Sequence, residues 1–369
     1  MTVLPSRHLF GPGPTNVPAS ILTALAQPTV GHLDPAFLEL MDTVSERLRY
    51  CYQTSNPLTF VLSAPGTIGM EASLVNLVEC GDKAIVCRNG VFGGRMTSML
   101  ERAGANVITV DQPWGEPVDP NALAAILRSH GDAVLVAFVH AETSTGVRSD
   151  AERIAALAHE HDCLVVADCV TSLSGVPLQV DDWGIDVAYS GSQKCLACVP
   201  GLSPITLSPR AVERIRGRRS PVQSWFADVS MLASYYETGE KTRAYHHTAP
   251  VNSLYAVNEA LRLVEVETLP IRWQRHADAA AHLYRRLGDA GLELIVAPEH
   301  RLASLTLVKI PDGVTDAPVR QRLLHERSIE LGAGLGEFAG KAWRIGLMGE
   351  NATPERADFI VDALVDAIG

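Results

Sequence analysis

The sequence predicts an α/β protein with a mostly parallel sheet between helices, followed by a smaller α+β domain. Short apolar runs alternate with helical stretches between residues 59 and 207, a pattern typical of a parallel sheet covered on both faces. After residue 267, long helical patterns surround shorter strands, which indicates a second unit. We therefore expect an N-terminal arm over 1–15, a large domain over 16–267 and a small domain over 268–369.

The predicted elements follow in chain order. Gly11, Pro12, Gly13 and Pro14 favour an extended arm, which we expect to have little to pack on in a single chain. Helices are predicted from apolar spacing over 36–51, 68–78, 93–103, 120–129 and 150–161. Strands are predicted over 59–63, 83–87, 107–110, 133–140, 163–168, 187–190 and 204–207. The small domain should contain helices over 271–290, 319–327 and 354–368, and strands over 292–296, 302–309 and 342–347.

Composition excludes several classes of function. The net charge of -11 argues against a sequence-independent grip on nucleic acid or on an anionic membrane. No apolar run is long enough to span a bilayer, and we expect no secretion signal. Seven cysteines without paired zinc spacing fit reduced thiols in the cytoplasm. The basic cluster Arg214–Arg219 is interpreted as a solvated helix end.

Three segments carry residues that could do chemistry. In Ser63–Glu71 a strand ends and a helix begins, and free amides there suit a phosphate, although a plain turn is favoured on this segment alone. Asp168 ends an apolar strand and could pair with a buried cation or cap a helix. Lys194 follows a short strand within small residues, so it is either a desolvated nucleophilic amine or a solvated loop lysine.

Together these features resemble the class V aminotransferases of fold type I, among them the alanine–glyoxylate and serine–glyoxylate aminotransferases. The resemblance covers nearly the whole chain. The motifs that carry it are GPGPTN (11–16), QTSNPLT (53–59), GMEASLVN (69–76), NGVFGGR (89–95), HAETSTGV (140–147), VADCVTSLSGVPL (166–178), GIDVAYSGSQKCL (184–196), YHHTAPVNSLY (245–255), GLGEFAGK (334–341) and RIGLMG (344–349). SGSQK and YHHT are the most specific of these.

The resemblance implies a pyridoxal 5'-phosphate enzyme and a role for each matching residue. Lys194 would hold the cofactor as a Schiff base and move the substrate proton, while Asp168 would pair with the ring nitrogen. The phosphate would be held by Gly66, Thr67 and Gln193, with Tyr245 and Thr248 contributed by the second subunit of a homodimer. Around the ring, Thr143 would contact the hydroxyl side, Val170 would pack beneath and Phe92 would stack above. Arg344 would bind the substrate carboxylate.

Several of these residues have a purely structural alternative. Phe92 could be only a core residue, and Arg344 could form a structural ion pair. Thr143 and Thr248 could be loop-capping residues. The adjacent pair His246 and His247 suggests a metal, but no further ligand lies at metal spacing, so we predict no metal site.

The predicted function is transfer of an amino group from a small amino acid, alanine or serine, to a small 2-oxo acid such as glyoxylate, by a ping-pong aldimine/ketimine mechanism. A lyase of the same fold is an alternative, and so is a transaminase for ureidoglycine or an aminophosphonate. A cysteine desulfurase is disfavoured because no cysteine follows Cys198. A non-catalytic protein on this scaffold is disfavoured because the expected cofactor contacts are present.

Overall fold

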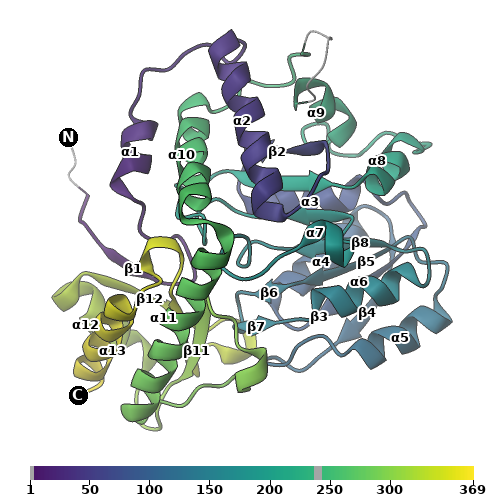
Figure 1. Cartoon of the computed structure of the whole chain (residues 1–369). Coiled ribbons are helices and arrows are strands. Elements are labelled where there is room, and N and C mark those ends of the chain that lie inside the picture. Colours follow the sequence, from purple (N-terminus) through teal and green to yellow (C-terminus); the bar gives the residue numbers. More distant parts are fainter. Residues whose placement is uncertain (1–3, 237–242) are drawn as a thin grey trace.

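A seven-stranded sheet forms the centre of the larger part of the molecule (Figure 1). The computed structural model describes residues 4–236 and 243–369. The strand order is β2-β10-β9-β8-β5-β3-β4, and β10 runs in the opposite direction to the other strands of this sheet. Their bounds are β2 Leu58–Leu62, β3 Lys83–Arg88, β4 Asn106–Asp111, β5 Leu135–Val139, β8 Leu164–Asp168, β9 Val187–Tyr189 and β10 Ser203–Leu207. The predicted mostly parallel sheet is confirmed.

Apolar runs in the central strands explain why this sheet is buried. Every residue of β5 and β8 is buried, so other elements cover both faces of the sheet. The helices of this part are α1 Ala19–Leu25, α2 Pro35–Tyr52, α3 Gly66–Val75, α4 Val91–Arg102, α5 Pro120–Ser129, α6 Ala151–His159, α7 Val180–Trp183, α8 Pro209–Arg216, α9 Val229–Tyr236 and α10 Val251–Glu267. The carboxyl ends of the parallel strands then deliver their loops to one edge of the sheet, where ligands usually bind.

A second sheet of four strands has the order β1-β12-β13-β11. Its strands are β1 His8–Phe10, β11 Leu305–Lys309, β12 Ile329–Ala333 and β13 Ala342–Gly346. The helices packed around it are α11 Leu269–Asp289, α12 Asp316–Arg327 and α13 Pro354–Ile368, with the 3-10 turns η1 Pro298–His300, η2 Gly336–Phe338 and η3 Gly349–Asn351. Its own apolar cluster includes Trp343, Leu283 and Ile360, all fully buried.

The N-terminal arm corrects one expectation. We expected residues 1–15 to have little to pack on in a single chain, but β1 pairs in parallel with β12. Phe10 is fully buried in the second sheet's core. The N-terminal arm therefore adds β1 to a sheet whose other strands, β11, β12 and β13, come from the C-terminal part of the chain.

Two predicted strands of the C-terminal part are wrong in extent. The segment 292–296 makes only an isolated bridge, between Leu294 and Val308, rather than a strand. β11 begins at Leu305 rather than 302, because the amide of Leu305 bonds back to the carbonyl of Leu302 in a turn. Conversely, β12 was not predicted, since Glu330, Gly332 and Ala333 are poor strand formers.

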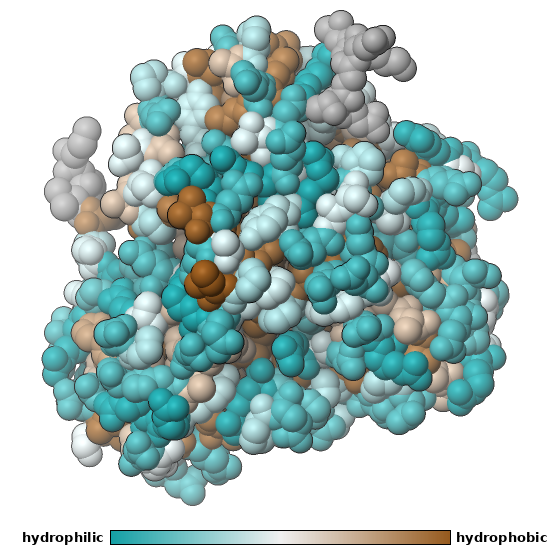
Figure 2. Space-filling model, in the orientation of Figure 1, coloured by the Kyte–Doolittle hydropathy of each residue, from teal (hydrophilic) through white to brown (hydrophobic). Residues whose placement is uncertain are grey.

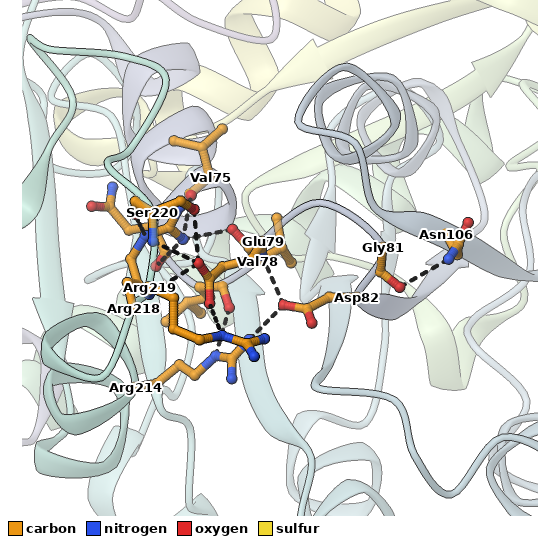
Figure 3. Close-up of polar contacts among 12 residues, drawn as sticks. Val75, Val78, Glu79, Gly81, Asp82, Asn106, Arg214, Arg218, Arg219 and Ser220 are labelled. Carbon is orange, nitrogen blue, oxygen red and sulfur yellow. Dashed lines mark hydrogen bonds and ion pairs between the residues drawn. The ribbon is translucent and has the colours of Figure 1, made fainter.

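The basic cluster at 214–219 lies at a helix end, as predicted, but it is not merely solvated (Figure 3). The guanidinium of Arg218 donates to the carbonyl oxygens of Val75, Asn76 and Val78, at and just after the end of α3. Arg214 bonds to the carbonyl of Leu77 and to Asp82. These arginines satisfy carbonyl groups that a helix end leaves open.

Hydrophobic side chains are mostly inside. The face in Figure 2 is largely hydrophilic, with hydrophobic residues scattered among polar ones. Among the residues described, no helix is both long enough and apolar enough to cross a membrane.

Candidate active site

Lys194 lies in the turn after β9, and only 8% of it is exposed. Its Nζ donates a hydrogen bond to the carbonyl oxygen of Pro12. Burial, with Arg344 nearby, lowers the pKa of the Lys194 ammonium to about 8. An appreciable fraction is therefore neutral amine near neutral pH, which is the form that attacks an aldehyde. The alternative of a solvated loop lysine is excluded by this burial.

The arm forms one wall of the site around Lys194, and sequence reasoning assigned it no such role. Gly13 has φ of +98°, and a Cβ there would lie 2.5 Å from Cδ of Lys194. The amide of Thr15 donates to the carbonyl of Gln193, 3.2 Å away. The GPGP pattern was the available signal, because glycine is the residue that permits both positive φ and close approach.

Asp168 is a buried anion at the carboxyl end of β8, with 2% exposed. It accepts hydrogen bonds from the amide of Val170, at 2.9 Å, and from Oη of Tyr189, at 2.8 Å. Burial raises the pKa of the Asp168 carboxyl to about 6, although these two bonds oppose the increase. The group is therefore mostly ionised at neutral pH and suits a cation beside it. The Val170 bond is a local Asx turn rather than the helix cap considered above.

The start of α3 has the features of an anion site. Pro65 stands at the N-cap and supplies no side-chain cap, so the first amides of the helix remain open. Gly66 lies close to the Asp168 segment, because a Cβ there would be 3.3 Å from Cγ2 of Val170 and from the carbonyl oxygen of Ser190. Gln193 has a buried Oε1 without a hydrogen-bond partner. The predicted residues Gly66, Val170 and Gln193 therefore lie close to Asp168 and Lys194.

Thr67 and Phe92 lie at the outer side of this cluster. Thr67 is exposed, and its Oγ1 accepts a hydrogen bond from Arg95 at 3.2 Å. The guanidinium of Arg95 also lies over the Phe92 ring, 4.9 Å from its centroid. Phe92 is half-buried and packs against the main core. Its stacking role therefore stays a prediction, as does its structural alternative.

Arg344 comes from β13 of the second sheet and contacts the turn between residues 142 and 147 of the larger part. Its Nε donates to the carbonyl of Ala333 at 2.7 Å, and a terminal nitrogen donates to the carbonyl of Thr143 at 3.2 Å. Only 7% of it is exposed, and among the described residues no carboxylate forms an ion pair with it. Burial lowers the pKa of Arg344 to about 10, so it remains a cation at neutral pH. A buried cation with no carboxylate in direct contact suits a substrate carboxylate better than a structural ion pair.

Thr143 lies on the short hairpin formed by β6 Ala141–Glu142 and β7 Val147–Arg148. Its hydroxyl is hydrogen-bonded to that of Thr171, on the loop after β8. Both side chains are buried, next to the segment that carries Asp168 and Val170. The hairpin therefore brings Thr143 to the same strand edge as Asp168.

Tyr245 and Thr248 do not join this cluster in a single chain. Tyr245 is 62% exposed, and its hydroxyl bonds to Oγ1 of Thr248 at 3.1 Å. The segment between them is tied to the site through His247, whose Nε2 lies 2.6 Å from Oγ of Ser63. His246 stacks on Trp225. Within the described parts of the chain, no group of three or more His, Cys, Asp or Glu residues could hold a metal.

Two buried groups of the site were not predicted. Tyr189 ends β9 and holds Asp168, as described above. Glu142 is fully buried and accepts a hydrogen bond from the amide of Phe92. Tyr189 lay in a strand pattern and Glu142 in a hairpin, so their sequence positions indicated core residues. Only their spatial neighbours show that they border the site.

These residues fit pyridoxal phosphate. The buried amine of Lys194 suits its aldehyde, the anion of Asp168 suits its ring nitrogen, and the open amides at Gly66 suit its phosphate. The side-chain amide of Gln193, whose Oε1 lacks a partner, could turn its Nε2 donor towards the phosphate. The fit rests on the buried charges of Lys194 and Asp168 and on the open amides at the start of α3.

Comparison with known proteins agrees with this chemistry. The family profile described as aminotransferase class-V matches residues 7–339. The chain is similar to alanine–glyoxylate aminotransferase of Rattus norvegicus, with 38% identity over 99% of this chain and 88% of the relative. It is similar to (S)-ureidoglycine–glyoxylate transaminase of Bacillus subtilis, with 33% identity over 98% and 90%. A crystal structure of alanine–glyoxylate aminotransferase from Nostoc sp. superposes with a TM-score of 0.97 at 48% identity, covering 100% of this chain and 97% of that one.

The family profile spans most of the chain, and the fold type I architecture is shared with this solved structure. The predicted fold class, enzyme class and cofactor are therefore confirmed. The chain belongs to the class V aminotransferases and is a pyridoxal-phosphate-dependent enzyme.

Proposed function

We propose that this enzyme transfers an amino group from a small amino acid, alanine or serine, to a small 2-oxo acid, glyoxylate being the favoured acceptor. The observation that carries the proposal is the buried guanidinium of Arg344, which contacts no carboxylate among the described residues and is close enough to Lys194 to lower the pKa of its ammonium. A substrate held by its carboxylate there would present its α-carbon to the Lys194 amine. The printed names of the relatives, alanine–glyoxylate aminotransferase among them, support this substrate pair.

Bound pyridoxal phosphate supplies an aldehyde that condenses with amines and a ring that accepts electron density. In the proposal, Lys194 holds the cofactor covalently in the resting enzyme. Freed from the cofactor, its Nζ would be a neutral base in a buried site, able to take the proton from the substrate α-carbon. The same Nζ would deliver that proton on the cofactor side, and water would then release the donor's carbon skeleton as a 2-oxo acid while the amino group stays behind.

Seven residues fix the orientation needed for that proton transfer. Asp168 holds a positive charge on the ring nitrogen, because a buried carboxylate favours a cation beside it. Gly66, Thr67 and Gln193 hold the phosphate end. Val170 and Phe92 pack on the ring faces, and Thr143 contacts the hydroxyl side. The opposite polarities at the two ends of the cofactor leave it one orientation.

We further propose a homodimer in which Tyr245 and Thr248 complete the phosphate site of the second subunit. Their hydroxyls point to each other on the surface of one chain, where Tyr245 and Trp225 are 62% and 59% exposed. Large exposed aromatics of this kind are enriched at protein interfaces. Sedimentation should give a dimer, and Tyr245→Phe should weaken phosphate binding without changing the sedimentation coefficient. A stable monomer with tightly held cofactor would contradict the shared site.

The division into an arm (1–15), a cofactor domain (16–267) and a small domain (268–369) belongs to the same proposal. Its support is the presence of separate apolar clusters on the two sheets. We also propose that the enzyme works in the cytoplasm. All seven cysteines are free, and six of them are buried, which fits a reducing compartment.

The substrate proposal is tested with purified holoenzyme. Alanine and glyoxylate should give pyruvate and glycine in equal amounts, and serine should replace alanine as donor. Each half-reaction should be visible separately as a change in cofactor absorbance, as a ping-pong mechanism requires. Arg344→Gln should raise KM for both substrates. Absence of glycine with both donors would refute the proposal.

The same assay separates the remaining candidates. A lyase would release pyruvate from one amino acid without an acceptor. Ureidoglycine is the donor named for one relative, and an aminophosphonate would replace the carboxylate at Arg344 by a phosphonate. A screen of half-reactions with these donors ranks them directly, because each productive donor converts the cofactor without an acceptor.

A further inference from the structure

Glu142 is a buried carboxyl group that the proposed reaction leaves unused. None of it is exposed, and it lies in the β6–β7 hairpin directly before Thr143. One carboxyl oxygen accepts hydrogen bonds from the amide of Ser144, at 2.9 Å, and from its hydroxyl, at 2.6 Å. The other oxygen accepts from the amide of Phe92, at 3.3 Å. A buried carboxyl with this many donors is built to carry charge at least part of the time.

The same group lies at the N-terminus of α4. Gly90 stands at the N-cap and has no side chain to cap the helix. Instead, Oγ of Ser144 accepts from the amide of Val91, at 3.0 Å, and Glu142 accepts from that of Phe92. A Cβ on Gly90 would lie 2.5 Å from Cδ of Glu142, so glycine is what lets the carboxyl approach. The helix terminus favours the ionised carboxylate.

The charges around Glu142 oppose one another. Arg344, from β13, donates a hydrogen bond to the carbonyl of Thr143, the residue after Glu142, at 3.2 Å, and the charge of Glu142 supports the positive charge of Arg344 although no direct ion pair joins them among the described residues. Burial and the anion of Asp168, from β8, act against a charge on Glu142 and raise the pKa of its carboxyl to about 7. Lys194 and Arg95 face Asp168 and favour the ionised form of that residue. Glu142 is therefore poised between its charged and neutral forms in the range where the enzyme works.

From this arrangement we propose that Glu142 is a positioning residue that gives up its charge when a substrate carboxylate binds at Arg344. Without substrate, the ionised Glu142 provides a nearby negative charge for Arg344 and accepts the hydrogen bond from the amide of Phe92 in the first turn of α4. When a carboxylate takes over at Arg344, two anions face one cation, and Glu142 takes up a proton from solvent. The inference rests on the proposed role of Arg344 as the carboxylate site.

The test uses propionate, a carboxylate of alanine's size that has no amino group and cannot react. Calorimetric titration of the holoenzyme, in buffers of different ionisation enthalpy, measures both the dissociation constant and the protons taken up. At pH 8 Glu142→Gln should bind propionate about threefold to tenfold more tightly than wild type, because a like charge has been removed. At pH 5.5 the two should bind equally, since Glu142 is then already protonated.

Proton uptake is the reading that a merely structural role would not change. Near pH 7.5 the wild type should take up part of a proton, and Glu142→Gln should take up less. The Schiff base on Lys194 can also exchange a proton, but that share appears in the cofactor absorbance and persists in the variant. Glu152→Gln is the matched control, because Glu152 lies exposed in the first turn of α6 and should behave as wild type.

The outcomes separate this inference from the proposed function. If propionate fails to bind, or binds Arg344→Gln as well as wild type, the carboxylate site is wrongly assigned and the inference falls with it. If binding depends on Arg344 but Glu142→Gln shows wild-type proton uptake and pH dependence, only the role of Glu142 is wrong. Should the variant fold poorly, a lack of proton uptake by the wild type near pH 7.5 would still overturn it.

Discussion

Tyr189→Phe should weaken cofactor binding in a way that depends on pH. Oη of Tyr189 donates to Asp168 across 2.8 Å, and both groups are buried. A hydrogen bond to a buried charge contributes roughly 1.5–3 kcal/mol, which corresponds to about one to two pKa units. Losing it should raise the pKa of the Asp168 carboxyl from about 6 to roughly 7–8. The ionised fraction at pH 7 would then fall from about 90% to between about 50% and 10%.

Because the cofactor pairs with the ionised carboxylate, its affinity should follow this fraction. We expect the apoenzyme variant to bind pyridoxal phosphate about 2-fold to 10-fold more weakly than wild type at pH 7. A raised carboxyl pKa removes the charged form as pH falls, so the defect should grow towards pH 6 and vanish near pH 9. Equilibrium dialysis from pH 6 to 9 measures it.

Tyr236→Phe is the matched control. Its buried hydroxyl donates to the carbonyl of Val61, at 2.7 Å, and makes no bond to Asp168. Its removal should cost stability but leave the pH dependence of cofactor binding unchanged. An equal weakening at pH 6 and pH 9 by Tyr189→Phe would refute the reasoning, since the hydroxyl would then act on shape rather than on the charge of Asp168.

Three further predictions concern binding and stability. Arg344→Lys should raise KM for both substrates by about 10-fold to 1,000-fold, because an ammonium cannot replace the bidentate hydrogen bonding of a guanidinium. Steady-state kinetics with both substrates measures this change. KM values equal to those of wild type would show that the substrate carboxylate binds elsewhere. Gly66→Ala should lower the affinity for pyridoxal phosphate in the same dialysis assay, because its Cβ would lie 3.3 Å from Val170 and Ser190. Gly94→Ala is the control, because a Cβ there meets open space, and it should bind the cofactor as tightly as wild type. Identical affinities of the two variants would place the phosphate elsewhere. Arg218→Ala should lower the free energy of unfolding by about 1–3 kcal/mol with kcat unchanged, because the carbonyls of Val75, Asn76 and Val78 lose their donor. Denaturant titration measures this loss, with Arg219→Ala, at an exposed side chain, as the control. A loss of activity without a loss of stability would contradict the prediction.

The parallel sheet could be predicted because its strands are buried on both faces. Runs such as Leu135–Val139 and Leu164–Asp168 carry apolar residues throughout, and that pattern is local. β12 could not be predicted, because its pairing with β1 depends on a segment more than 300 residues away in sequence. Strand pairing of this kind is a tertiary effect that overrides weak local preference.

The residues of the candidate site also fall into those that local sequence identifies and those that only tertiary contacts identify. Lys194 and Asp168 could be named because Lys194 follows a buried strand and Asp168 ends one, each within a recognisable motif. The roles of Pro12 and Gly13 could not, since only folding brings the arm against Lys194. Glu142 and Tyr189 read as ordinary core positions until the partners of their polar atoms are known. Their functional meaning lies in contacts between distant segments.

The covalent attachment of the cofactor tests the central claim most directly. Holoenzyme is reduced with borohydride, digested, and its peptides are measured by mass spectrometry. We predict a pyridoxyl group on Lys194 and on no other lysine, and none in Lys194→Ala. A pyridoxyl group on a different residue, or its absence from reduced wild-type enzyme, would contradict the account.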